Sequence, residues 1–280
     1  MKPCRERSTR RRRAALLIGA ALAATVQVAR AENPQDRYWV RLEYFLPSIE
    51  SSARLDPSRT AATGATLSME DDLGLRDRKG TPYVLLGTRL GERWRLEFEY
   101  YRLRRSGSRI LDRDIPWGDQ AYSLSTRLDT EFESTVYRLV VGWSFLRSPV
   151  AEAGVALGLH ATEFELALDG QTAIGSSASR ATDRRDQLVP LPTVGLYGSY
   201  ALSPHWVLRA RLDRLSLSYK EYDGALTNLQ AGVDWRFAKH WSLGVSYRLV
   251  HYSLELSRPR FDGALKYRFH GPSIHISATF

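Results

Sequence analysis

The stretch "RWRLEFEYYR", residues 93–102, alternates apolar and charged side chains almost without interruption. Trp94, Leu96, Phe98 and Tyr100 fall on one parity, and charged residues lie between them. Because successive side chains of a strand point to opposite faces, the stretch predicts a two-faced β-strand. The pattern leaves open which face meets water. The apolar face points inward in a soluble barrel and outward, to lipid, in a membrane barrel.

The N-terminal segment has the three parts of a secretory signal peptide. Four arginines at 10–13 precede an apolar stretch over 14–26, and the small-x-small sequence "ARA" follows at 29–31. The apolar stretch is too short to span a bilayer. We therefore predict a cleaved signal peptide over residues 1–31 and a single domain over residues 32–280.

Removal of this segment changes the charge of the protein. It takes away eight of the 40 Lys and Arg residues and one of the 31 Asp and Glu residues, which leaves a net charge of +2. It also contains Cys4, the single cysteine of the chain. The mature chain is therefore expected to have no disulfide, no thiolate metal site and no cofactor, and its charge gives no reason to expect nucleic acid as a partner.

The rest of the chain reads as strands joined by connections of alternating length. Strand-like runs lie at 38–47, 81–90, 93–103, 131–146, 151–167, 190–201, 205–219, 225–238, 240–256 and 264–280. Tight turns alternate with long polar segments, the longest at 48–80, 104–130 and 168–189. This alternation is typical of an up-and-down membrane barrel, whereas a β-sandwich would mix loop lengths at both ends. We predict an all-β fold, a closed antiparallel transmembrane barrel of about ten strands, with eight or twelve as alternatives.

Tryptophan is concentrated near the short turns. The indole ring prefers the membrane interface, where its ring is half buried and its N–H stays hydrated. Six of the seven tryptophans lie near a short turn or at the start of the first strand, and they are predicted to form an aromatic girdle: Trp39, Trp94, Trp143, Trp206, Trp235 and Trp241.

The last ten residues, "GPSIHISATF", place Ile274, Ile276, Ala278 and Phe280 on one parity and end on the aromatic residue. This segment resembles the C-terminal assembly signal of Gram-negative outer-membrane β-barrels, and the strand pattern of most of the mature chain resembles that of small, porin-like members. The resemblance implies an outer-membrane location with both termini in the periplasm. It implies outer-membrane lipid and lipopolysaccharide as surroundings, and the barrel assembly machinery and periplasmic chaperones as partners during biogenesis.

With the apolar face toward lipid, strand parity assigns many charged residues to the lumen. These are Arg41, Glu43, Arg95, Glu97, Glu99, Arg138, Arg209, Arg211, Asp213, Asp234, Arg236, Arg248, Lys266 and Arg268, joined by Arg89, Glu152, His160, His270 and His275. Buried charges must pair or be hydrated. The lumen is therefore either a salt-bridged filling or a thin, anion-preferring water path. Changes of parity within 205–219 and at 271–272 further predict β-bulges.

Barrels of this size include the omptin proteases and enzymes that modify lipid A. Omptins use paired acids that face an Asp–His pair, but none of the histidines here lies two residues after an aspartate, in an Asp-x-His motif. His251 lies nearest the outer rim, without a visible orienting group. We therefore predict no catalytic, cofactor or metal residues and a structural or surface-interaction role, with a narrow small-solute channel as a variant. An enzyme that acts on lipid A or surface peptides remains the alternative.

Two charged loop segments carry weaker indications. The acidic run at 70–72 suggests a site for a divalent cation, but it lacks the spaced oxygen ligands of a calcium loop. Arg104, Arg105, Arg109 and Arg113 lie where lipopolysaccharide phosphates are expected, and arginine binds phosphate well. A solvated loop of mixed charge is the favoured explanation for both segments.

Overall fold

The computed structural model describes residues 37–56, 65–117, 120–174, 177–219, 222–258 and 261–280. The predicted signal peptide over 1–31 lies outside these ranges. In the described part of the chain, no helix is long and apolar enough to cross a membrane.

Fourteen strands make up the described structure. They are β1 (Tyr38–Phe45), β2 (Ser48–Leu55), β3 (Leu67–Ser68), β4 (Thr81–Leu90), β5 (Trp94–Ile110), β6 (Ile115–Trp117), β7 (Gln120–Tyr122), β8 (Arg127–Arg147), β9 (Ala151–Ile174), β10 (Ser177–Ala201), β11 (Trp206–Tyr219), β12 (Tyr222–Arg236), β13 (Trp241–Arg258) and β14 (Phe261–Thr279).

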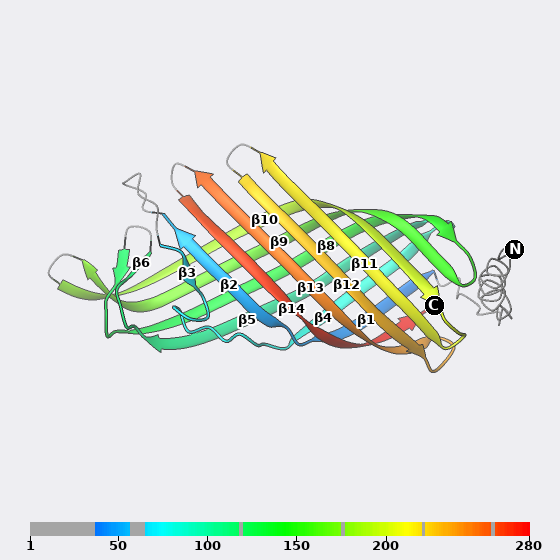
Figure 1. Ribbon diagram of the computed structural model, residues 1–280, viewed down its shortest axis with the longest axis horizontal. Coiled ribbons are helices and arrows are strands. Elements are labelled where there is room, and N and C mark those ends of the chain that lie inside the picture. Colours follow the sequence, from blue (N-terminus) through cyan, green and yellow to red (C-terminus); the bar gives the residue numbers. More distant parts are fainter. Residues whose placement is uncertain (1–36, 57–64, 118–119, 175–176, 220–221, 259–260) are drawn as a thin grey trace, which may run out of the picture.

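Ten of these strands form a closed antiparallel barrel. Their order is β1-β4-β5-β8-β9-β10-β11-β12-β13-β14, and β1 pairs again with β14 to close the cylinder. Figure 1 shows the strands crossing the long axis of the molecule at a tilt, as barrel closure requires. The predicted all-β barrel of about ten strands is confirmed.

The first strand of the barrel is interrupted. β1 pairs with residues 273–279 of β14, and β2 continues along the same neighbour by pairing with residues 263–270. Pro47 lies at the interruption, where its missing N–H cannot donate to a ladder. The N–H of Leu46 donates instead to the carbonyl of Pro272 at 3.0 Å. The hairpin of β6 and β7 lies off the main path.

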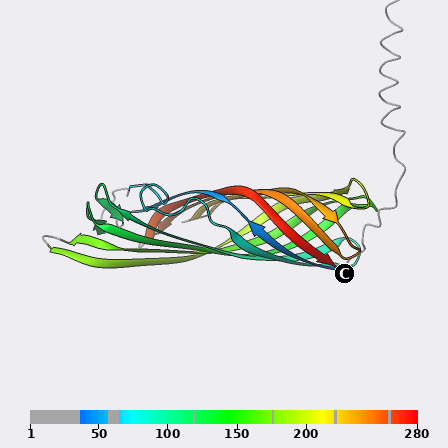
Figure 2. The ribbon, with the colours of Figure 1, turned by 90° about the horizontal axis from the view of Figure 1, so that it is seen from below.

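The two ends of the barrel differ. One end, called the short-turn end, holds the connections at 91–93, 148–150, 202–205 and 237–240. Both ends of the described chain meet there, where the N–H of Arg37 donates to the carbonyl of Phe280 at 2.7 Å. At the opposite, long-loop end β9 meets β10, β11 meets β12 and β13 meets β14, and Figure 2 shows the β9–β10 hairpin projecting from it.

The predicted long loops at 104–130 and 168–189 are wrong over much of their length. β5 continues to Ile110, and β9 and β10 pair without interruption past the register Ala167↔Arg184. In this part of the barrel the inner face is apolar and the outer face is charged, since Phe164 and Leu166 are buried inside while Glu163 on the outer face is exposed. Charged outward positions made these strand extensions read as loops.

The predicted bulges within 205–219 and at 271–272 are also wrong. The β11–β12 and β13–β14 ladders run without a register shift. A register shift lies instead between Ser144 and Leu146 of β8, beside a short turn. The apolar residues change parity because the lining changes from polar to apolar along each strand. Leu215, for example, packs against the core inside the barrel.

Candidate functional site

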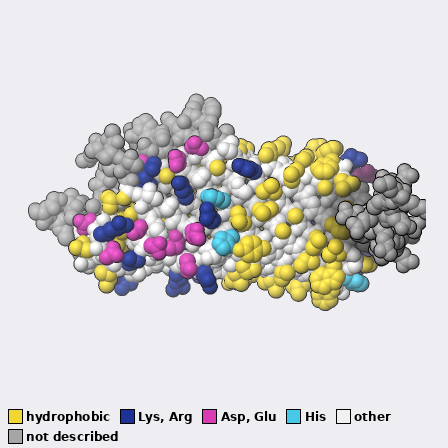
Figure 3. All heavy atoms as spheres, in the orientation of Figure 1, with side chains coloured by type: hydrophobic (Ala, Val, Ile, Leu, Met, Phe, Trp, Pro, Cys, Tyr) yellow, Lys and Arg dark blue, Asp and Glu magenta, His cyan; other side chains and the backbone are white. Residues whose placement is uncertain are grey.

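The outer surface carries an apolar band next to the short-turn end, which appears as the yellow half of Figure 3. In the opening stretch, Trp94 and Phe98 are exposed on this surface while Glu97 and Glu99 are buried within. The band on β13 runs from Trp241 to Leu249, eight residue steps that correspond to roughly 20 Å of height for a tilted strand. This height is close to the hydrocarbon thickness that membrane barrels match, so the apolar face points to lipid.

Five of the six predicted girdle residues lie on this outer surface at the short-turn end. They are Trp94, Trp143, Trp206, Trp235 and Trp241, each 37–52% exposed. Trp206 and Trp235 are neighbours on adjacent strands, and their rings stack with centroids 6.4 Å apart. The girdle is therefore a feature of the folded wall.

Trp39 is the exception, and its assignment to the girdle is wrong. It shares the inward parity of Arg41 and Glu43 and lines the lumen at the short-turn end. The guanidinium of Arg95 lies 5.0 Å above its ring. Gly87 on the adjacent strand provides the space, because a Cβ there would clash with the indole.

The C-terminal strand presents most of its predicted apolar residues on the outer surface of the barrel. Ile274, Ile276 and Phe280 are exposed on the outer surface. Ala278 shares their parity but is buried. The role of these residues as an assembly signal stays a prediction.

Most of the predicted lumen charges do lie inside. The structure places the following residues on the inner face, either buried or lining the internal cavity: Arg41, Glu43, Arg95, Glu97, Glu99, Arg138, Arg209, Arg211, Asp213, Asp234, Arg236 and Arg248. Arg89, Glu152, His160 and His275 join them.

Lys266, Arg268 and His270 are wrongly assigned to the lumen. All three lie on the outer face of β14 because its parity does not change, so Tyr267 and Phe269 point inside. The Nη1 atom of Arg268 lies 3.6 Å from the Oε2 atom of exposed Glu50 on β2. His270 Nδ1 lies 2.8 Å from the hydroxyl of Tyr247. These groups lie just beyond the apolar band, where charge meets water or headgroups.

An ionic group around Glu99, which is completely buried, lies across the middle of the lumen. Three arginines converge on its carboxylate: Arg138 at 2.6 Å, Arg248 at 3.6 Å, and Arg211. Arg138 also reaches Asp213 at 2.8 Å. We call these five residues the Glu99 cluster.

The Glu99 cluster ties strands from different sides of the barrel together. Glu99 lies on β5, whereas Arg211 lies on β11 and Arg248 on β13, and neither of those strands is next to β5 in the ladder. Asn228 bridges further, since it receives a hydrogen bond from Arg248 at 3.0 Å and donates one to Asp213 at 3.2 Å. Strand parity predicted the inward direction of these side chains, but their pairing across the lumen could not be read from the sequence.

An aromatic layer lies on the long-loop side of the Glu99 cluster. Most of its rings meet edge to face or tilted, and Phe132 stacks on Phe164, with centroid separations of 5.1–6.5 Å. The layer consists of Phe45, Tyr101, Phe132, Phe164, Tyr252, Tyr267 and Phe269, all buried. It belongs to a hydrophobic core that fills the projecting half of the barrel. This half has apolar side chains inside and charged side chains outside, as a soluble protein has, whereas the embedded half has the reverse.

Arg105 is buried within this core, although its neighbours in sequence suggested an exposed phosphate-binding group. Its guanidinium pairs with Glu70, donates to Ser51 Oγ at 2.7 Å and lies 5.1 Å from the ring of Phe132. Glu70 in turn accepts from the N–H of Ser51 at 2.8 Å. The acidic run at 70–72 thus forms internal contacts that hold the segment between β3 and β4 against the barrel.

The other arginines of this region lie on the outer surface in ion pairs. Arg102 and Arg104 both contact Glu133, at 2.5 and 2.8 Å. The hydrogen bond from Arg102 lowers the pKa of the Glu133 carboxyl, which lies beyond the apolar band. Arg113 pairs with Asp72 at 2.6 Å. Glu165 on β9 lies directly across from Glu133, so this part of the outer face is of mixed charge.

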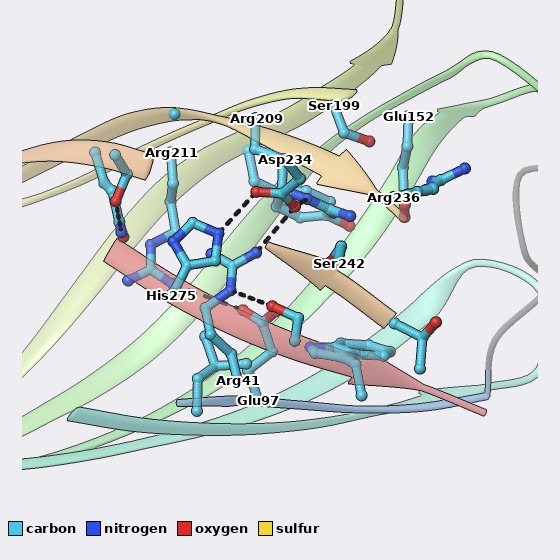
Figure 4. A pocket seen from close by; sticks show the side chains of 18 of the residues that line it. Arg41, Glu97, Glu152, Ser199, Arg209, Arg211, Asp234, Arg236, Ser242 and His275 are labelled. Atoms are coloured by element: carbon cyan, nitrogen blue, oxygen red, sulfur yellow. Dashed lines mark hydrogen bonds and ion pairs between the residues drawn. The ribbon is translucent and has the colours of Figure 1, made fainter. Parts of the chain in front are cut away.

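A cavity of about 160 Å³ lies inside the barrel at the short-turn end, and we call it the vestibule. Figure 4 shows charged side chains from strands on all sides of the barrel converging on it. Its charged lining consists of Arg41, Arg89, Arg95, Arg209, Arg211, Arg236 and Lys239 together with Glu97, Glu152 and Asp234.

The acids of the vestibule are held by these bases. Asp234 receives Arg209 at 2.5 Å, Arg41 at 3.3 Å and His275 at 2.8 Å. Glu152 forms two parallel hydrogen bonds with Arg89, each 3.0 Å long. Bidentate pairs of this kind fix the direction of both groups, so the vestibule has a preorganised polar wall.

Within the described ranges, no three His, Cys, Asp or Glu side chains come together as a metal site. His251, the histidine nearest the rim on sequence grounds, lies exposed on the outer face of β13.

An apolar band around the outside of a closed barrel is stable in contact with lipid hydrocarbon. The fold is therefore that of an integral membrane β-barrel. The chain belongs to the family described as the outer membrane protein beta-barrel domain, whose model matches residues 14–280. The predicted location in the outer membrane of a Gram-negative bacterium is thereby confirmed. No curated protein matches the sequence.

Solved structures with a similar fold include the outer membrane protease OmpT from Escherichia coli. This chain is 12% identical to OmpT, with 88% of this chain and 98% of OmpT covered and a TM-score of 0.58. The translocator domain of the autotransporter NalP from Neisseria meningitidis is 13% identical, with 97% of each chain covered and a TM-score of 0.45. OprG from Pseudomonas aeruginosa is 10% identical, with 88% and 96% covered and a TM-score of 0.39. At these identities the likeness concerns the fold alone.

Proposed function

We propose that the protein is a non-conducting outer-membrane barrel that acts through the projecting surface of its long-loop end. The observation that carries this proposal is the double closure of the lumen. The Glu99 cluster links opposite walls, and the aromatic layer packs directly beyond it. An ion or solute that entered the vestibule would meet buried ion pairs and then an apolar core.

The orientation follows from the asymmetry of the two ends. Barrels of this class keep short turns in the periplasm and their longer extensions outside the cell, and here the extensions are strands such as β9 and β10, which project at the long-loop end. The short-turn end, with both chain ends, is therefore assigned to the periplasm. The charged exterior beyond the apolar band then faces lipopolysaccharide, and exposed arginines there, such as Arg102 and Arg104, can contact its phosphates.

Biogenesis partners belong to the same proposal. The outward Ile274, Ile276 and Phe280 at the chain end form an apolar strip next to the closing strand pair β1–β14. Recognition of this strip by the barrel assembly machinery, after escort by periplasmic chaperones, is consistent with its exposure to lipid.

Planar-bilayer recording tests the closed lumen. Purified protein inserted into a bilayer is expected to give no current steps, while an open porin in the same bilayer provides the positive control. Stepwise currents from the wild-type protein would refute the proposal and favour the narrow channel. Mass spectrometry of lipid A from cells with and without the gene is expected to show no difference. A changed lipid A would favour the enzyme.

Cysteine labelling tests the orientation, because the mature chain is expected to be free of cysteine. Asp112→Cys at the long-loop end and Lys239→Cys at the short-turn end place one thiol on each side, and both native side chains are exposed. A membrane-impermeant maleimide added to intact cells is expected to label the first variant alone. Labelling of the second alone would invert the assignment.

A further inference from the structure

The vestibule carries more positive charge than its own acids neutralise. Among the described residues that line it, seven are Arg or Lys and three are Asp or Glu. Counting Arg, Lys, Asp and Glu alone, this leaves an excess of four positive charges around a cavity of about 160 Å³. An excess of this size inside a barrel attracts small anions from the open end.

Several guanidinium groups keep unused donors at this cavity. Within the described contacts, Arg209 binds Asp234 through Nε and its two terminal amino groups are left with donor capacity. The Nη2 atom of Arg211 is buried and has no hydrogen-bond partner among these residues, and the same holds for Nε of Arg95. These two atoms are closed off from the cavity, whereas the Arg209 side chain is 39% exposed, so Arg209 is the guanidinium that an anion in the cavity would reach first.

The remaining walls hold these groups in place. The guanidinium of Arg95 lies between two rings, 5.0 Å from Trp39 and 4.5 Å from Tyr197. Tyr197 is itself fixed by Ser144 Oγ, 2.9 Å from its hydroxyl. A guanidinium held between aromatic faces loses little further freedom when an anion binds.

We propose that the vestibule binds a small oxyanion of the phosphate type, taken up from the short-turn end. The planar fork of arginine matches two oxygens of a tetrahedral oxyanion, and several forks meet here. The cavity of about 160 Å³ is large enough to admit inorganic phosphate. The inference goes beyond the proposed function, because uptake and release at one end do not depend on whether the lumen conducts.

Calorimetric titration of the purified full chain in maltoside micelles tests this site. Inorganic phosphate is titrated at constant ionic strength, with sulfate, acetate and chloride as comparison anions. We expect saturable binding of phosphate and sulfate, weaker binding of acetate and no measurable heat with chloride. Phosphate affinity is expected to fall as salt is added, since the attraction is electrostatic.

Variants locate the binding. Arg209→Gln is expected to weaken phosphate binding roughly tenfold or more, the effect of losing a charge-assisted pair. Arg209→Lys keeps the charge without the fork and should lie between the two. Arg214→Gln is the matched control, because Arg214 is an exposed residue of the same strand that points outward beyond the apolar band. It should bind like the wild type.

Three results would overturn the inference. The first is phosphate binding no stronger than chloride binding. The second is wild-type affinity in both Arg209→Gln and Arg41→Gln, with folding of each variant verified by the heat-dependent gel shift of barrels. The third is a loss of binding in Arg104→Gln with no loss in Arg209→Gln, which would move the anion to the outer surface.

Discussion

The Glu99 cluster provides the sharpest test of a dry, ion-paired lumen, through the substitution Glu99→Gln. The Glu99 side chain is 0% exposed and has three arginines around its carboxylate. At 2.6 Å, its attraction to Arg138 alone is about 6 kcal/mol at an effective dielectric constant of about 20. The amide still accepts a hydrogen bond, but the arginines lose their counter-charge. A loss of about 3–5 kcal/mol in unfolding free energy is therefore expected.

Urea unfolding in lipid vesicles, followed by tryptophan fluorescence, measures this loss. Glu133→Gln is the matched control, because Glu133 also binds two arginines, but at an outer surface where ion pairs contribute little. Combining Glu99→Gln with Arg248→Met removes one of the stranded positive charges. The double variant should be less destabilised than the sum of the two single variants.

A small effect would refute the reasoning. If Glu99→Gln unfolds within about 1 kcal/mol of the wild type, water already screens the cluster and the breaking of a buried pair is the wrong description. The proposed closure of the lumen by buried charges would then fail as well.

Three further outcomes follow from the described packing. Phe132→Ala should lower the unfolding free energy by about 3–5 kcal/mol in the same urea assay, because Phe132 is 1% exposed within the aromatic layer, whereas Glu131→Ala on the outer face should change little. Of two single-tryptophan variants in vesicles of brominated lipid, the one that retains Trp143 should be quenched and the one that retains Trp39 should not. Arg105→Gln should expose the segment between β3 and β4, so that trypsin cleaves it faster in micelles, as mass spectrometry of the fragments would show; an unchanged cleavage rate would contradict the role of the buried pair with Glu70.

Strand parity predicted the embedded half of the wall well, and the reason is local. In the stretch over 93–102, the outward and inward side chains alternate with chemistry that matches lipid on one side and a polar lumen on the other. The ten strands and five outward girdle tryptophans follow from the same rule, since each needs only the alternation of one strand and the position of a turn.

The same rule failed where the surroundings of the wall change. Beyond the apolar band, Tyr267 and Phe269 point inside and Lys266 and Arg268 outside, although apolar residues nearer the chain end point outward. The alternation of inward and outward side chains is continuous along β14. What changes along the strand is the medium outside the barrel, from lipid to water. A single strand does not show where hydrocarbon ends and water begins, so the apparent slip read as a bulge.

The amino-acid sequence by itself determined a chain of two-faced strands with a lipid-facing girdle, because these properties depend on residues close together along the chain. Tertiary structure alone decided which charges meet. Glu99, Arg211 and Arg248 come from strands that are not neighbours. Trp39 points inward by its parity with Arg41, but the space for its ring comes from Gly87 on the next strand. Closure of the barrel brings such residues together, and with them the filled lumen and the positive vestibule.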